Sequence, residues 1–158
     1  MASTVKGVPE GYSTVTPNVV VRDAAKAIDF YRRAFGAEEI MRMPGPDGRT
    51  IMHAEIRIGN SILMLSDEMP EMECRAPQSL GGSPVSFYVY VPDVDSFFKK
   101  AVTAGATEKM PVADMFWGDR IGGLTDPYGH KWTIATHTKD MTPEQIRKGA
   151  EAHFSRKS

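Results

Sequence analysis

The sequence predicts an α+β fold made of two βαβββ modules and a C-terminal helix, and the main reason is an internal near-repeat. Val21-Arg22-Asp23 ends a β-branched run and opens a helical pattern, and Val91-Pro92-Asp93 does the same about 70 residues later. Each helical pattern then stops at a glycine, Gly36 or Gly105. One strand pattern precedes each helix and further strand patterns follow it, so both halves have the order strand, helix, strand, strand, strand.

The first module spans about residues 12–68. Its helix has apolar residues at helical spacing from Ala24 to Phe35. Asp23 can cap the first N–H groups of this helix, and Gly36 suits the left-handed position after its last turn. Runs rich in β-branched and apolar residues predict the strands Ser13–Val21, Glu38–Met43, Ile51–Ile58 and Ser61–Ser66.

The second module spans about residues 85–138 and ends in a separate tail. Prolines and the Gly81-Gly82 pair indicate a surface linker over residues 69–84. In the tail, residues 139–158, the capping-box pattern Thr142-Pro143-Glu144-Gln145 predicts a third helix. The second helix should run from Val94 to Gly105, among the strands Val85–Val91, Thr107–Pro111, Ile121–Thr125 and Lys131–His137.

Length and charge limit the possible functions. The chain has 158 residues, 41% of them hydrophobic, which fits one globular domain. Its 19 basic and 20 acidic residues provide no basic surface for nucleic acid. The single Cys74 cannot form an internal disulfide, the apolar runs are shorter than the ~20 residues of a membrane span, and Met1 to Thr16 lacks a signal-peptide core. We therefore expect a cytoplasmic protein with no nucleic-acid or membrane partner.

Several motifs together resemble the vicinal oxygen chelate superfamily, which includes glyoxalase I, extradiol dioxygenases and bleomycin-resistance proteins. Ala27-Ile28-Asp29-Phe30-Tyr31 before Phe35-Gly36-Ala37, and Asp126-Pro127-Tyr128-Gly129-His130-Lys131-Trp132, are similar to its helix and last-hairpin signatures. Thr16-Pro17, Met52-His53-Ala54-Glu55 and Phe116-Trp117-Gly118-Asp119-Arg120 resemble its PhnB-like branch. The resemblance covers residues 12–138 as one domain. It implies a curved eight-stranded mixed sheet and a homodimer, because family members commonly form their cups between units of two chains.

The resemblance also implies where a metal would bind. Its four ligand positions fall on Thr16, on Met64 or Leu63, on Ser86 or Phe87, and on Thr133. None of these is His, Glu or Asp, so we expect no metal and no cofactor, and no glyoxalase or dioxygenase chemistry.

The candidate catalytic residues are His53, Glu55 and Asp119. His53 and Glu55 lie two apart on a strand and so share a face, but their alternation with apolar residues also fits simple polar neighbours or a replacement metal site. Asp119 beside Arg120 fits a catalytic pair, although an ion pair or turn contact is favoured. The histidines His130, His137 and His153 are expected to be solvated and not coupled into a relay.

Without a metal, a cup of this family can still bind a ligand through apolar and aromatic surface. We therefore expect the protein to bind a small planar aromatic metabolite or antibiotic. The alternative is a metal-independent lyase or isomerase that uses His53 or Asp119; a solvent-reachable His53 bonded to Glu55 inside the cup would favour it. The resemblance and strand alternation select the ligand-binding candidates Thr16, Asn18, Met64, Ser86, Tyr88, Tyr90, Phe116, Trp117, Arg120 and Thr133.

Overall fold

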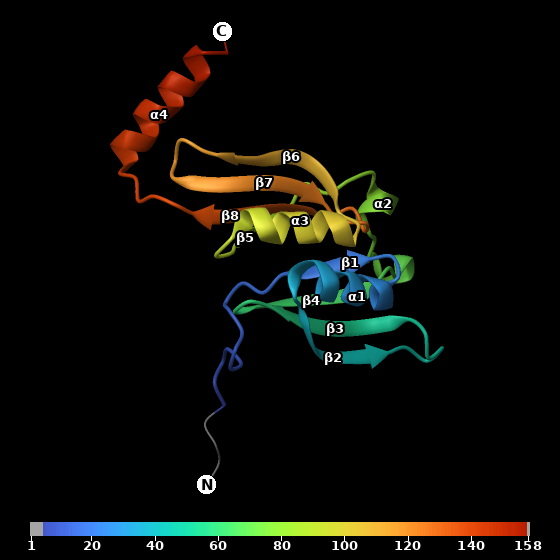
Figure 1. Ribbon diagram of the computed structural model, residues 1–158. Coiled ribbons are helices and arrows are strands. Elements are labelled where there is room, and N and C mark those ends of the chain that lie inside the picture. The colour runs from blue at the N-terminus through green and yellow to red at the C-terminus, as the bar shows by residue number, and fades with distance from the viewer. Residues whose placement is uncertain (1–4, 158) are drawn as a thin grey trace. The chain divides into compact units, whose positions relative to one another are not determined.

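The structure is a computed structural model that describes residues 5–157. The chain divides into two compact units, unit 1 up to Gly82 and unit 2 from Ser83 onward (Figure 1). Each unit contains one four-stranded sheet with one long helix against it. No helix within residues 5–157 is both long and apolar enough to span a membrane.

Unit 1 has the predicted order strand, helix, strand, strand, strand. Its sheet has the strand order β1-β4-β3-β2, in which β1 is parallel to β4 and the other neighbours are antiparallel. Two short helical segments follow, η1 (Pro70–Met72) and α2 (Pro77–Leu80). The main elements are β1 (Asn18–Val21), α1 (Ala24–Phe35), β2 (Glu38–Pro44), β3 (Ile51–Ile58) and β4 (Ser61–Asp67).

Helix α1 covers one face of the unit 1 sheet. The Asp23 side chain accepts a hydrogen bond from the backbone N–H of Lys26, and Gly36 ends the helix in the left-handed conformation at φ 66°. Alternate strand residues such as Val19, Ala54 and Leu65 are buried beneath the helix. Asn18, Met64 and Glu55 lie side by side on the opposite face.

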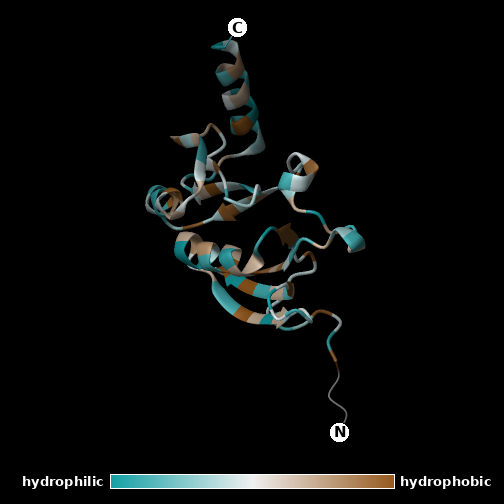
Figure 2. Ribbon diagram, turned by 90° about the vertical axis from the view of Figure 1, so that its right-hand side faces the viewer, coloured by the Kyte–Doolittle hydropathy of each residue, from teal (hydrophilic) through white to brown (hydrophobic). Residues whose placement is uncertain are grey.

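Unit 2 repeats this arrangement and adds a C-terminal helix. Its strand order is β5-β8-β7-β6, again with one parallel pair, β5 with β8. The helix α4 carries the predicted capping box between Thr142 and Gln145, and its separate teal and brown bands are visible in Figure 2. The elements are β5 (Ser86–Tyr90), α3 (Val94–Ala104), β6 (Thr107–Asp114), β7 (Asp119–Thr125), β8 (Lys131–His137) and α4 (Pro143–Ser155).

Helix α3 packs closely on the unit 2 sheet at Gly122. A β-carbon at this position would lie 2.7 Å from the Phe98 ring, so only glycine allows the approach. Trp132 and Leu124 are buried on the same face, and the Trp132 indole donates to Asp126 Oδ2 at 2.8 Å. The opposite face presents Tyr88, Thr133 and Gly123 in one cross-strand row, since Thr133 pairs with both of the others.

The predicted α+β fold of two βαβββ modules and a C-terminal helix is confirmed, with the eight strands forming two four-stranded sheets. Three strand boundaries differ by two residues or more. Strand β6 ends at Asp114 rather than Pro111, because its ladder with β7 continues to the Asp114–Arg120 pair. Strand β1 begins at Asn18 rather than Ser13, because the chain bends at Thr14 and Val15, where the Thr16 hydroxyl donates to the backbone oxygen of Ser13. Strand β7 begins at Asp119 rather than Ile121, because a tight turn joins Met115 to Asp119. Ser158, the last residue of the predicted tail, lies outside the described residues.

Candidate functional site

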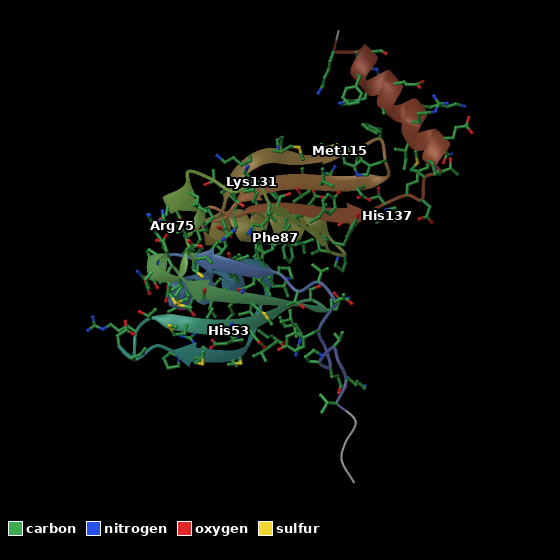
Figure 3. All side chains as sticks on the ribbon, turned by 180° about the vertical axis from the view of Figure 1, so that it is seen from behind. His53, Arg75, Phe87, Met115, Lys131 and His137 are labelled. Atoms are coloured by element: carbon green, nitrogen blue, oxygen red, sulfur yellow. The ribbon has the colours of Figure 1, made fainter. Side chains whose placement is uncertain are left out.

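Each unit buries one carboxylate on the sheet face opposite its helix. In unit 1 this residue is Glu55 on β3, which is 7% exposed, and in unit 2 it is Asp119 at the start of β7, which is 4% exposed. Each carboxylate is hydrogen-bonded to a histidine and to at least one tyrosine. Figure 3 shows the two histidines, His53 on β3 and His137 at the end of β8.

In unit 1, the Glu55 carboxylate has a partner on each oxygen. His53 Nε2 lies 3.0 Å from Oε1, and the Tyr12 hydroxyl donates to Oε2. The hydrogen bonds from His53 and Tyr12 outweigh burial and hold the pKa of Glu55 below its usual range. Because an ionised carboxylate can only accept, His53 Nε2 carries the hydrogen in this pair.

A cavity of about 380 Å³ adjoins this carboxylate. Its walls are formed by the N-terminal segment from Gly7 to Thr16 and by Glu55 and Met64 on the sheet. Two predicted ligand-binding residues, Thr16 and Met64, therefore meet a predicted catalytic residue in one cavity. His53 contacts the Glu55 carboxylate but is not among the residues that line the cavity.

In unit 2, Asp119 accepts hydrogen bonds from two tyrosines. The hydroxyls of Tyr88 and Tyr90 both lie 3.0 Å from Oδ2. His137 Nδ1 lies 2.7 Å from Oδ1, and its Nε2 lies 2.8 Å from Asp140 Oδ1. Tyr88 and Tyr90 are two apart on β5 and so share a face, with their ring centroids 5.1 Å apart.

These contacts set the protonation states of the unit 2 group. Burial alone would raise the pKa of Asp119, but the hydrogen bonds from His137, Tyr88 and Tyr90 lower it on balance. Its two carboxylate partners, Asp119 and Asp140, raise the pKa of His137. Burial and the bond to Asp119 raise the pKa of Tyr88 to about 12, although the contact with Trp117 lowers this pKa in part. Asp119 is therefore ionised at neutral pH while Tyr88 keeps its hydroxyl proton.

The rings of Tyr88 and Tyr90 remain open to solvent although their hydroxyls are held. These residues are 45% and 62% exposed, and we call them the tyrosine platform. Trp117, in the β6–β7 turn, contacts Tyr88 and meets the Phe116 ring edge-on at 4.9 Å. Phe116 instead contacts α4, with its ring centroid 5.6 Å from His153. The platform and Trp117 thus form one aromatic surface.

The remaining predicted ligand-binding residues lie in both units and on both faces of the unit 2 sheet. Ser86 and Thr133 lie on the platform side of the unit 2 sheet, and Asn18 lies beside Met64 in unit 1. Arg120 does not join them. It lies on the α3 side of β7, where its guanidinium makes two 2.8 Å hydrogen bonds to Asp95 and a 3.3 Å contact to Asp114. Asp119 and Arg120 therefore form neither a catalytic pair nor an ion pair with each other, because adjacent strand residues point to opposite faces. The predicted turn contact is present, since the Met115 N–H donates to the backbone oxygen of Asp119.

The expectation of solvated, uncoupled histidines is wrong in two respects: His130 is not solvated, and His137, although exposed, is coupled to carboxylates. His130 is buried in the β7–β8 turn, with its ring centroid 6.2 Å from that of Phe87. His137 is directly opposite Asp119 in the β7–β8 ladder and bonds to it. The predicted Asp126-Pro127-Tyr128-Gly129 turn contained this signal, since extending the Thr125 to Lys131 pairing along the hairpin places Asp119 opposite His137.

The donor atoms do not fit the divalent metal of the metal-dependent superfamily members. The implied ligand positions carry a hydroxyl or a thioether at Thr16, Met64, Ser86 and Thr133. Within residues 5–157, no group of three or more His, Cys, Asp or Glu side chains could hold a metal ion. His53 and Glu55 provide two such donors, but their third neighbour is the Tyr12 hydroxyl.

Comparisons with known proteins agree with this fold. A sequence model of the Glyoxalase/Bleomycin resistance protein/Dioxygenase superfamily matches residues 13–134. The uncharacterised protein Mb0911c of Mycobacterium bovis is 44% identical over 136 residues, which cover 84% of this chain and 89% of that protein. The solved structure of TioX from Micromonospora sp. ML1 has a TM-score of 0.62 at 30% identity, covering 82% of this chain and 100% of TioX. The PhnB protein from Bacillus cereus has a TM-score of 0.61 at 19% identity, covering 78% and 99%.

Proposed function

The chain belongs to the Glyoxalase/Bleomycin resistance protein/Dioxygenase superfamily, and within this fold we propose that it binds a small planar aromatic metabolite or antibiotic on the tyrosine platform. One observation carries the proposal. The buried Asp119 holds the hydroxyls of Tyr88 and Tyr90 while leaving both rings exposed to a ligand.

This arrangement favours binding because the rings of Tyr88 and Tyr90 are already ordered before a ligand binds. A tyrosine fixed at its hydroxyl loses less side-chain freedom when a ligand arrives, which lowers the entropy cost of association. Each aromatic contact contributes about 0.5–1.5 kcal/mol beyond the buried area. Trp117 extends the same surface from the β6–β7 turn, as its contact with Tyr88 indicates.

A second candidate, a metal-independent lyase or isomerase, is favoured by the contact between the partly exposed His53 and Glu55. Two features weaken it. His53 directs Nε2 at Glu55, and the residue that lines the cavity is Glu55, whose lowered pKa makes it a weak base. In unit 2, both ring nitrogens of His137 are already engaged by carboxylates. Binding is therefore the better supported function.

The test is a thermal-shift screen of flat heteroaromatic compounds, followed by calorimetric titration of the best hit. We expect Tyr90→Ala to weaken binding about fivefold, equivalent to about 1 kcal/mol for one lost aromatic contact. Tyr90→Phe, which keeps the ring, should bind more tightly than Tyr90→Ala. Phe154→Ala removes an equally exposed aromatic ring from α4 and serves as the control with unchanged affinity. Equal binding by Tyr90→Ala and the wild type would refute the platform as the ligand site.

We also propose that the chain is a homodimer. Among residues 5–157, α1 and α3 each contact the sheet of their own unit on one face, and the edge strand β2 exposes Ile40, Met41 and Met43. Sedimentation equilibrium at micromolar concentration should give twice the 17.4 kDa of one chain. A mass equal to that of one chain would contradict the proposal.

A further inference from the structure

We infer that the cavity of unit 1 is a second binding site, for an organic cation that carries an amine or amidine group on an apolar body, with Glu55 as its counter-ion. The cavity and the tyrosine platform belong to different units and share no residue. The inference is therefore independent of the ligand proposed for the platform.

The cavity has the size and the lining of a ligand site. Its volume of about 380 Å³ lies within the roughly 300–1,000 Å³ of small-molecule pockets. Met64 lies directly opposite Glu55 in the β3–β4 ladder, so a thioether adjoins the carboxylate. Val8 and Pro9 add apolar surface from the N-terminal segment. Methionine adapts its shape readily, so this wall can fit an apolar body of variable form.

Glu55 has unused capacity to accept hydrogen bonds. A carboxylate offers about four lone-pair positions. His53 occupies one position on Oε1 and Tyr12 one on Oε2, so each oxygen can accept one more bond. A primary ammonium or an amidinium group has enough N–H donors to use both, and hydrogen bonds between charged groups are about twice as strong as neutral ones.

The local charge also favours a cation. The protein partners of Glu55 are a histidine and a tyrosine, neither of which carries a permanent positive charge. A buried carboxylate is costly unless it is paired, and a cationic ligand would supply the missing charge. Arg57, on the same face of β3, lies 3.5 Å from the exposed Glu38, which compensates part of its charge.

The N-terminal segment is held against the sheet in a way that shapes the cavity. The Tyr12 hydroxyl donates to Glu55, and Thr16 Oγ1 donates to the backbone oxygen of Ser13 at 2.9 Å. The first bond ties the segment to β3, and the second closes a bend within the segment that forms one wall. A ligand can therefore enter a site whose walls are already in place, which lowers the cost of ordering them.

The experiment is a two-dimensional amide NMR titration of the full chain with cyclohexylmethylamine, a non-aromatic cation. Cyclohexylmethanol is the matched neutral probe. We expect the amine to shift the amide signals of Thr16, Glu55 and Met64, and to bind at least tenfold more tightly than the alcohol. Raising NaCl from 50 to 500 mM should weaken binding of the amine only, because salt screens the ion pair.

Glu55→Gln keeps the shape of the side chain but removes its charge, and we expect it to weaken amine binding at least tenfold. Asp29→Asn removes an exposed carboxylate from α1, on the other side of the sheet, and should leave binding unchanged within twofold. The comparison of amine with alcohol on the wild-type chain does not depend on either variant folding. Equal affinity for amine and alcohol, shifts confined to unit 2, or no shifts at 20 mM amine would each overturn the inference.

Discussion

The two units have the same topology, yet they place their buried carboxylates at different positions. In unit 1 the cross-strand row opposite the helix reads Asn18, Met64 and Glu55, whereas the matching row of unit 2 reads Tyr88, Thr133 and Gly123. Unit 2 therefore has no side chain where unit 1 has its carboxylate. Its acid, Asp119, stands at the end of β7 instead.

Because of this difference, the sheet faces opposite α1 and α3 present different chemical groups. In unit 1 the carboxylate itself faces a cavity, beneath a segment from the N-terminus. In unit 2 the carboxylate is covered by its tyrosine and histidine partners, and aromatic rings form the accessible surface. One fold can thus present either a charge or an aromatic surface, depending on which strand position carries the acid.

The largest expected effect is the loss of stability when a buried side chain on the helix-facing side of β8 is removed. Trp132 and Leu63 occupy matching positions in the two units. Trp132 precedes Thr133 on β8, and Leu63 precedes Met64, the equivalent residue on β4. Trp132→Ala should reduce the free energy of unfolding by about 3–5 kcal/mol, and Leu63→Ala by about 2–5 kcal/mol. Urea unfolding followed by circular dichroism measures both. A loss below about 1 kcal/mol for Trp132→Ala would show that the α3 side of unit 2 is not a packed core.

A smaller effect is expected at the other tryptophan. Trp117→Ala should leave stability nearly unchanged but weaken an aromatic ligand by about 1 kcal/mol, or roughly fivefold, since it removes one ring from the aromatic surface. Calorimetric titration measures this change, and quenching of Trp117 fluorescence in a Trp132→Phe background locates the ligand. Arg120→Gln is the control, because Arg120 lies on the α3 side of β7. Unfolding of Trp117→Ala would assign that ring to the core instead.

The hydrogen-bonded groups around Glu55 in unit 1 and around Asp119 in unit 2 should also change the stability of the protein differently with pH. The raised pKa of His137 means that its contribution to stability is complete below the unfolded value of about 6.5 and is lost as the pH rises through the folded value. Glu55, with a lowered pKa, contributes above about 4.3 and loses this contribution as the pH falls. Urea midpoints should therefore decline more between pH 6 and pH 9 for the wild type than for His137→Gln. Parallel curves would mean that the bond to Asp119 does not form in solution.

No effect is expected from metal removal. Because the implied ligand positions carry hydroxyl and thioether groups, dialysis against EDTA should leave the melting temperature unchanged within about 1 °C. Elemental analysis before and after dialysis provides the control. One equivalent of a transition metal that persists in the wild type and is lost in His53→Ala would show that His53 and Glu55 form a replacement metal site.

The sequence by itself determined the repeat, the helix boundaries at Asp23, Gly36 and Gly105, and the face of most strand residues, with Arg120 as an exception. Capping and strand alternation are local properties, so they can be inferred from neighbouring residues alone. The same alternation placed Tyr88 and Tyr90 together on the face opposite α3, as the structure has them.

Only the tertiary structure decided which distant side chains meet. The contact of Tyr12 with Glu55 spans 43 residues, and that of Tyr90 with Asp119 spans 29. Such contacts depend on strand register, and a shift of one residue would turn every side chain of a strand to the other face. The start of β7 at Asp119 and the path of the N-terminal segment set both networks. Neither follows from residue type, because both depend on turns that close through backbone hydrogen bonds.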